Sequence, residues 1–315
     1  MRDKLINALK VVVTVGLLAA VALTVDLRQV WQTLATAHWD DMLSAIAVYQ
    51  LGILVRSYRW KVLLDGQEVR VPYGRLVNLY YVGTFFNNFL PSGFGGDVVK
   101  MYELSRHGAS GALAVSTVLV DRMMGLLVLF AMALVALPLS WHLVPLSVAW
   151  ALLVLIVGVA LAVWLFLNRP LIEALAARLG PLRKALAHEK VAAFYASFHR
   201  YRRTALFKAA AASLVFNLTL ILVQIYLARA VGVYIGLGYF LVFVPIISSL
   251  LALPISISGF GVREGGYVLL FGQAGVIANQ AVAMSLLFYI LNVITGLVGG
   301  GLYLRQSVRG LRSKS

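Results

Sequence analysis

The sequence predicts an all-α polytopic membrane protein, with about six full spans and two re-entrant hairpins in a single integral membrane domain, 1–315. The first observation is the composition. Of the 315 residues, 61% are hydrophobic and 12% are charged, whereas soluble domains average roughly 45–50% apolar and about 25% charged. The second observation is that the apolar runs are continuous. Transmembrane β-strands alternate apolar and polar residues, so these runs predict helices.

Six apolar segments reach the roughly 20 residues that a helix needs to cross a bilayer. They are residues 5–25, 42–64, 113–137, 146–167, 205–228 and 280–304. The first of them resembles a signal peptide, because basic residues precede it. It is close to spanning length, however, and Asp26 follows it without a clear cleavage site, so we interpret it as a retained span.

The basic residues predict the orientation of the chain. Lys and Arg are frequent within 56–75, within 169–208 and from Arg305 onward, whereas 138–145 and 230–238 contain neither. By the positive-inside rule, both termini are expected on the cytoplasmic side. Loops that face anionic lipid also account for the net charge of +15, so we expect no nucleic-acid partner.

Two further apolar segments are interrupted. Glycines break residues 76–105 after Leu90, while residues 239–274 are expected to break at Pro245 and at Pro254. The predicted orientation puts both ends of each segment on one side of the membrane, so each is expected to form a re-entrant hairpin. Non-helical backbone at membrane depth is tolerated only where protein or a water-filled cavity satisfies it.

The two hairpins share the tetrapeptide SGFG, at Ser92–Gly95 and Ser258–Gly261. Each copy follows a Leu-Pro pair, precedes an acidic residue and lies between two spans. Units 42–137 and 205–304 therefore predict an inverted-topology repeat, a pattern typical of transporters whose sites lie at broken helices near the midplane. Between the units, residues 169–204 are interpreted as an amphipathic cytoplasmic linker that joins the halves, rather than a lipid sensor.

Polar residues flank the first break. Asp97 falls near the N-terminus of the returning half-helix, where the helix dipole favours a negative group, and free N–H groups at Gly95 and Gly96 would equally suit a phosphate. Lys100 follows one turn later and completes a candidate headgroup site. A ladder of paired charges at the membrane surface is the structural alternative. Asn88 directly precedes the break, and its alternative role is interhelical hydrogen bonding.

Two pairs of charged residues lie deeper in apolar sequence. Asp121 and Arg122 fall inside the span 113–137, where each charge costs about 2.5–3.5 kcal/mol on insertion scales. Neighbouring side chains on a helix point about 100° apart, so each needs a partner from another segment or a wet cavity. Arg263 and Glu264, in the second break, carry the same cost and form the strongest candidate pair. A structural interhelical ion pair is the alternative for both.

Other residues have simpler explanations. Arg56 and Arg59 lie near a predicted interface beside Tyr58 and Trp60, where snorkelling and anchoring explain them. The sequence contains no nucleophile–base pair, no metal-ligand spacing of histidines and no cysteine. The glycine-rich GFGG and GFGVREGG lack the strand–turn–helix context of dinucleotide loops. We therefore expect no catalytic residue, no metal and no cofactor.

Three motifs carry a family resemblance: NNFLPSGFGGDV at Asn87–Val98, VDR at Val120–Arg122 and GFGVREG at Gly259–Gly265. With them the chain resembles, over nearly its whole length, the lysylphosphatidylglycerol synthase transmembrane family. This flippase-like membrane region occurs alone in many prokaryotic proteins and fused to a synthetase in the multiple peptide resistance factor. The family often has Arg soon after the Asp-Val of the first motif. Here the basic residue is Lys100, which keeps the charge but lacks the fork geometry suited to phosphate.

The resemblance implies a lipid-translocating role in a prokaryotic cytoplasmic (inner) membrane. We expect a flippase-like transporter of an anionic phospholipid or a polyprenyl-linked lipid, and no lysyl transfer, because the sequence has no synthetase domain. The candidate substrate-binding or translocation residues are Asn88, Asp97, Lys100, Asp121, Arg122, Arg263 and Glu264. Two alternatives stay open, a membrane-embedded headgroup transferase and a non-transporting partner of a lipid-modifying enzyme. Homo-oligomer formation stays open as well.

Overall fold

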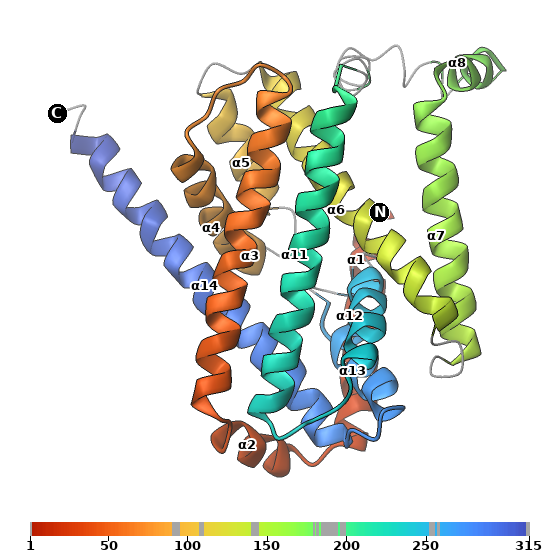
Figure 1. Ribbon diagram of the computed structural model, residues 1–315, viewed down its shortest axis with the longest axis vertical. Coiled ribbons are helices and arrows are strands. Elements are labelled where there is room, and N and C mark those ends of the chain that lie inside the picture. The colour runs from red at the N-terminus through yellow and green to blue at the C-terminus, as the bar shows by residue number, and fades with distance from the viewer. Residues whose placement is uncertain are drawn as a thin grey trace.

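The predicted all-helical class is confirmed. The computed structural model describes residues 2–89, 95–106, 110–139, 145–178, 180, 183, 195, 200–251, 256 and 259–312. Within these residues the regular structure consists of twelve helices (Figure 1). In chain order they are α1 (Arg2–Thr24), α2 (Leu27–Ala35), α3 (Trp39–Asp65), α4 (Tyr73–Phe89), α5 (Gly95–Ser105), α6 (Gly111–Leu139), α7 (Leu146–Leu167), α8 (Arg169–Arg178), α11 (Arg203–Ala230), α12 (Leu237–Leu251), α13 (Val262–Gly272) and α14 (Ala278–Arg312).

The chain is a multi-pass membrane protein. Among the described residues, α6, α11 and α14 are long and apolar enough to cross a bilayer, and α1 with α2 forms a fourth candidate that bends by 81° at its break. By length alone, α3 with 27 residues and α7 with 22 also exceed the roughly 20 residues of a span. Backbone groups in lipid must be satisfied within the segment, which is why apolar runs of this length fold as helices.

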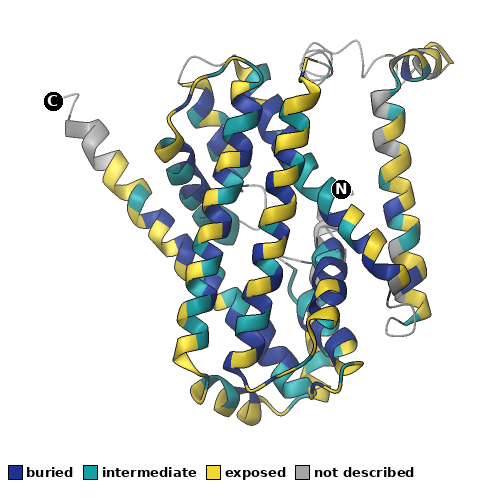
Figure 2. Cartoon of the chain, viewed as in Figure 1, coloured by how far each residue is buried: buried dark blue, intermediate teal, exposed yellow. Residues whose placement is uncertain are grey.

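The outer surface is apolar, as expected for a protein surrounded by lipid. Figure 2 shows exposed positions along the outward faces of α7 and α11. Large side chains occupy many of them, including Trp150 and Trp164 on α7 and Phe207, Leu218 and Leu222 on α11. Contiguous apolar surface of this kind is rare on soluble monomers and marks contact with a partner or a membrane.

The short helix α2 lies outside the predicted spans, and hydrogen bonds from Asp26 and Asn279 hold its first turn in place. The Asp26 carboxylate accepts hydrogen bonds from the backbone N–H groups of Arg28, at 2.8 Å, and Gln29, at 3.4 Å, as an N-cap. Asn279, next to the start of α14, then binds the backbone N–H of Asp26 at 3.0 Å and the side chain of Gln29 at 2.6 Å. The sharp turn between α1 and α2 is therefore tied to α14.

Each interrupted segment forms two short helices that contact each other, α4 with α5 and α12 with α13. Residues 90–94, which include Pro91 and most of the first SGFG, lie outside the described residues, as do Pro254 and Ser258. At the second break, Gly259 and Gly261 both have φ of 80°, a backbone conformation that favours glycine. Their positive φ explains why this turn needs glycines.

The predicted break at Pro245 is wrong, because α12 continues through that residue as a helix. Proline removes one N–H donor, but transmembrane helices tolerate it where neighbouring groups satisfy the backbone. The donor missing at Pro245 is the helical partner of the Leu241 carbonyl, whereas the Ser249 hydroxyl donates to the Pro245 carbonyl at 2.7 Å. The side chains around Pro245 are buried, so the packed neighbours of α12 hold the helix together there. The break in this segment therefore lies after Leu251 rather than at Pro245.

Glycines bring the first hairpin close to its neighbours. A Cβ at Gly96 on α5 would overlap the backbone of Gly83 on α4. On α14, a Cβ at Gly299 would meet the backbone of Tyr81, and a Cβ at Gly300 would meet the ring of Phe85. Small residues that let helix backbones approach are typical of membrane helix interfaces. The helix α4 is thus held between α5 and α14 at close range.

The remaining contacts pair the two halves of the chain. At the centre, α3 and α11 run side by side (Figure 1). Helix α4 packs against α14, and α12 packs against α6, so the first arm of each hairpin meets the last long helix of the other half. Helix α1 contacts α13, and α7 contacts α6, α8 and α12. Beyond α8, most of the predicted linker 169–204 lies outside the described residues.

Candidate functional site

Six charged side chains from α3, α5 and α6 form one connected group with the rings of Trp60 and Tyr80, which we call the cationic cluster. Its charged members are Arg56, Arg59, Lys100, Arg122, Asp97 and Asp121. Two elements of local sequence position it. Residues 56, 59 and 60 lie on one face of α3, because they are three and four residues apart, and residues 97 and 100 do so on α5.

The centre of the cluster is a buried ion pair between Arg59 and Asp121. The Arg59 Nε donates to Asp121 Oδ1 at 2.7 Å, and both side chains are almost wholly buried. The Tyr80 hydroxyl donates to the other carboxylate oxygen, and Arg59 Nη1 donates to the Ser213 hydroxyl at 3.0 Å. A buried charge needs such partners. This pair therefore joins α3, α4, α6 and α11.

Lys100 extends the cluster toward the first hairpin. Its ammonium lies 3.5 Å from the centre of the Tyr80 ring and 5.4 Å from that of Trp60, in the geometry of cation–π contacts. It also lies 3.8 Å from Asp97 Oδ1. The Lys100 side chain is buried, so its charge is held by two aromatic rings and a carboxylate rather than by water.

Arg122 and Arg56 form the edges of the cluster. Arg122 forms an ion pair with Asp97, and its side chain is 38% exposed, which makes it the most accessible of the ion-paired members of the cluster. The Arg56 guanidinium lies 5.0 Å from the centre of the Tyr80 ring and 4.9 Å from that of Phe216. Asp121 and Arg122 thus find partners on different helices, as their divergent directions on α6 predict.

The cluster has more cations than carboxylates. Four side chains carry positive charge and two carry negative charge, a formal excess of two. In addition, Arg56 Nε and Trp60 Nε1 are buried donors without a hydrogen-bond acceptor among the described residues. Across all the residues that the structure describes, no group of three or more His, Cys, Asp or Glu side chains is placed to hold a metal ion. The arrangement is therefore suited to an anion.

Sequence reasoning missed Arg59. Its interpretation as an interfacial anchor is wrong, because its side chain is buried and paired with Asp121. A signal was available, since a carboxylate inside the apolar span 113–137 requires a cation and its neighbour Arg122 points away from it. The choice of Arg59 over other arginines, however, is a matter of helix packing. Gly125 on α6 leaves the necessary space, since a Cβ there would lie 2.7 Å from Arg59 Nη1.

The N-terminus of α5 differs in part from the expectation. The backbone N–H of Gly96 donates to the Asn87 side-chain carbonyl at 2.8 Å. This N–H is therefore not available to a phosphate while that hydrogen bond is formed. Its neighbour Asn88 donates to the backbone carbonyl of Asn292 on α14 at 2.8 Å. Asn87 and Asn88 therefore fix the end of α4 to α5 on one side and to α14 on the other.

At the second break, Glu264 binds within its own turn. Its Oε2 accepts from the backbone N–H of Gly261 at 2.7 Å, as in a capping box, and its Oε1 accepts from the Ser285 hydroxyl on α14 at 2.9 Å. Glu264 is buried, and it makes no ion pair with any described residue. The Arg263 guanidinium lies 5.6 Å from the centre of the Tyr289 ring, also on α14.

Six of the seven predicted site residues thus fall into two places, and Asn88 lies apart from both, at the end of α4 against α14. Asp97, Lys100, Asp121 and Arg122 belong to the cationic cluster, whereas Arg263 and Glu264 lie at the second break. Helix α14 contacts the second break and the end of α4. It presents Ser285 and Tyr289 to the second hairpin and Asn292 to the end of α4.

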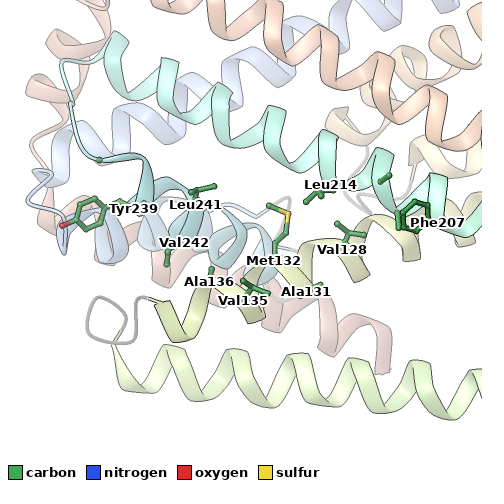
Figure 3. A pocket seen from close by; sticks show the side chains of 14 residues that line it. Val128, Ala131, Met132, Val135, Ala136, Phe207, Leu214, Tyr239, Leu241 and Val242 are labelled. Carbon is green, nitrogen blue, oxygen red and sulfur yellow. The ribbon is translucent and has the colours of Figure 1, made fainter.

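An apolar cavity between α6, α11 and α12, which we call the α6–α11 groove, is shown in Figure 3. Its volume is about 850 Å³, within the usual range of ligand pockets. Side chains from α6, α11 and α12 line it, and Figure 3 shows Val128, Met132 and Phe207 directed toward it. Its lining is almost entirely hydrocarbon.

Comparisons with known proteins agree with the membrane architecture. The family model described as "Lysylphosphatidylglycerol synthase TM region" matches residues 7–300 of the chain. A UPF0104 membrane protein from Pyrococcus horikoshii is 27% identical over 106 residues. That match spans 32% of this chain and 32% of the relative. The two proteins are therefore compared over only about a third of their lengths, and the match agrees with the membrane class.

Proposed function

The chain belongs to the lysylphosphatidylglycerol synthase transmembrane family, and from that premise we propose that it is a flippase-like lipid transporter. Its substrate is an anionic phospholipid or a lipid-linked anionic headgroup, which it moves across the cytoplasmic membrane without chemical change. The observation that carries the proposal is the formal excess of two positive charges in the largely buried cationic cluster. Arginine and lysine are the side chains that bind phosphate best.

The cluster offers a headgroup both charge and unsatisfied donors. Arg56 Nε and Trp60 Nε1 lack acceptors among the described residues, and phosphate oxygens would supply them. Arg122, the partly exposed member, is the natural first contact. A phosphate that binds there competes with Asp97 for Arg122 and Lys100, so headgroup entry and the opening of this ion-pair network are one event. Charge-assisted hydrogen bonds to phosphate are about twice as strong as neutral ones.

The packing supports an inverted-topology repeat. We assign α3, the α4–α5 hairpin and α6 to one unit, and α11, the α12–α13 hairpin and α14 to the other. Exchanging the units maps the α4–α14 contact onto α12–α6, the α5–α6 contact onto α13–α14, and α3–α11 onto itself. Transporters with inverted repeats bind substrate at broken helices between the repeats. In this assignment both hairpins are re-entrant, from opposite sides, and both termini are cytoplasmic.

Reconstituted vesicles test the proposal. The purified chain in liposomes should move fluorescent phosphatidylglycerol between leaflets faster than empty liposomes do, and phosphatidylcholine less so. Lys100→Gln and Arg122→Gln should reduce the phosphatidylglycerol rate. The matched control is Lys61→Gln, because Lys61 forms an exposed ion pair with Asp65 on the same helix turn.

Three outcomes contradict the proposal. Rates equal to empty liposomes for phosphatidylglycerol and for polyprenyl-phosphate lipids would remove the transport function. Formation of a modified lipid by the purified chain would point to a headgroup transferase. Full cellular function of folded Lys100→Gln and Arg122→Gln variants would point to a non-transporting partner.

A further inference from the structure

We infer that the α6–α11 groove holds an acyl chain of the lipid whose headgroup occupies the cationic cluster. The inference rests on the proposed function for the headgroup and adds a second site, for the tail. Three observations carry it: the chemistry of the groove, its elongated course between α11 and α12, and its position on the face of α6 that carries Asp121.

The side chains that line the groove are almost all apolar, so the groove suits a hydrocarbon ligand. Its two long walls, α6 and α11, are candidate membrane spans, so the medium beside it is lipid. Apolar cavities do not retain water, and an empty groove of about 850 Å³ would forfeit the dispersion contacts of its lining. Lipid tails are the apolar molecules that surround these spans. The small side chains of Ala131, Ala210 and Ala211 create the space.

The length of the groove fits a chain rather than a compact ligand. Phe207, at one end, lies in the first turns of α11, while Tyr239, at the other, follows the end of the same helix and belongs to α12 (Figure 3). The groove therefore runs from Phe207–Leu214 of α11, along Val128–Ala136 of α6, to the start of α12. A straight acyl chain running parallel to the spans matches this shape.

The groove is lined by the same face of α6 that carries Asp121, beginning at Val128. Val128, Met132 and Val135 follow Asp121 by seven, eleven and fourteen residues, which places all four on the same side of the helix. Between Asp121 and Val128 lies Gly125, which leaves room for the Arg59 guanidinium. In this proposal the phosphate binds at Arg122, the exposed edge of the cluster, and the tail lies along α6 from Val128 onward.

Photo-crosslinking in liposomes tests the tail site. The probe is phosphatidylglycerol with a diazirine in one acyl chain, and labelled peptides are mapped by mass spectrometry. We expect saturable labelling of α6 between Val128 and Ala136 and of α11 between Phe207 and Leu214, competed by unlabelled phosphatidylglycerol. Labelling of the outer face of α7, which contacts bulk lipid, should not saturate and provides the internal reference.

Filling the groove should abolish this labelling. Ala131→Trp and Val135→Trp place a large ring in the groove from exposed positions, and each should lose most of the saturable labelling. Ala160→Trp, at an exposed position on α7, is the matched control and should retain it. Folding of each variant is verified by size-exclusion chromatography, and the use of two groove variants protects the test against one that misfolds.

A second competitor separates the tail site from the headgroup site. Dioleoylglycerol has the tails but no phosphate, so it should compete for the groove more weakly than phosphatidylglycerol, and Lys100→Gln should remove that difference. Equal competition by both lipids in the wild-type chain would contradict the anionic headgroup while leaving the tail site intact. Non-saturable labelling of the groove, or labelling unaffected by both tryptophans, would overturn the tail site itself.

A helix from a second copy of the chain is the competing occupant. The natural sequence contains no cysteine, so Met132→Cys introduces a single thiol in the groove. Oxidation should leave this variant monomeric in membranes. An efficient disulfide-linked dimer through residue 132 would assign the groove to a protein interface and overturn the inference.

Discussion

The acidic residue at the first break, Asp97, forms ion pairs with Lys100 on its own helix and with Arg122 on α6. The acidic residue at the second break, Glu264, instead accepts hydrogen bonds from the backbone N–H of Gly261 and the hydroxyl of Ser285. Both acids follow a copy of the same tetrapeptide, SGFG. The first acid therefore belongs to a charged network of several helices, and the second caps a turn and joins it to one neighbour. Similar sequence thus supports two different electrostatic roles.

The difference teaches that the two hairpins carry unequal charge, and would therefore contribute unequally to the binding of the proposed anionic substrate. The surplus of positive charge lies on the side of the first hairpin, while the buried acid of the second is engaged by neutral donors. An asymmetric pathway of this kind gives an anion one place of strong attraction rather than two equal ones. The following predictions test that asymmetry, from the largest expected effect on stability to the smallest.

Removing the central carboxylate should be the most damaging change. Asp121→Ala leaves the Arg59 charge buried without its partner, which costs about 3–5 kcal/mol of folding free energy. Glu264→Ala should cost less, about 1–3 kcal/mol, because it leaves only neutral donors unsatisfied. Thermal unfolding of the purified variants in detergent measures both. The double variant Arg59→Met/Asp121→Leu should recover much of the loss, and equal losses for Asp121→Ala and Glu264→Ala would remove the contrast.

The glycines of the two hairpins should respond differently to alanine. Gly96→Ala places a Cβ on the backbone of Gly83 and should cost about 1–3 kcal/mol through overpacking. Gly265→Ala, near the start of α13, meets nothing within 4 Å and should be neutral or slightly stabilising, since alanine favours helix by up to about 1 kcal/mol. The yield of folded protein and its unfolding temperature distinguish the two. A tolerated Gly96→Ala would mean that the hairpin arms can separate freely.

The cap at the second break should act as a unit with α14. Glu264→Gln and Ser285→Ala each weaken the hydrogen bond between the two residues, and each should cost about 0.5–1.5 kcal/mol. Because both remove the same contact, the double variant should cost less than their sum. A double-mutant cycle on unfolding free energy measures this coupling. Strict additivity would show that α14 does not hold the turn through Ser285.

The partly exposed member of the cluster should matter least for stability. Arg122→Gln removes an ion pair whose arginine side chain is 38% exposed, so its cost should be about 0–1 kcal/mol. Its effect on lipid should be larger, with weaker binding of phosphatidylglycerol relative to phosphatidylcholine in native mass spectrometry. Unchanged lipid preference, together with unchanged stability, would exclude Arg122 from the pathway.

The helices were predictable because lipid leaves the chain few alternatives. The span 146–167 has the same bounds in α7, and the other spans differ from α1, α3, α6, α11 and α14 mainly in their terminal turns. An apolar run in a bilayer must satisfy its own backbone, and only a helix does so locally. Pro245 was misjudged for the opposite reason. Its tolerance depends on the buried surroundings of α12, which no local rule contains.

The site was only half predictable. Asp121 could be identified from the sequence because it lies inside an apolar span, where the cost of desolvating its charge requires a partner. The partner itself, Arg59, lies 62 residues earlier in the chain, and its selection depends on how α3 packs against α6. Similarly, Glu264 was identified as costly, but its engagement by Ser285 depends on the register of α14. The sequence therefore shows which charged residues lie in apolar segments, whereas the packing of the helices decides which partner each one has.

The glycine contact between α4 and α14 has a mechanical consequence. Backbone lies against backbone at Gly299. The same two helices are also joined by the Asn88–Asn292 and Gln306–Asn78 hydrogen bonds and by the Phe86–Tyr303 ring contact. Close packing with specific contacts along its length resists sliding, so α4 and α14 should move as one body. Substituting Gly299 with a larger residue should push the two helices apart.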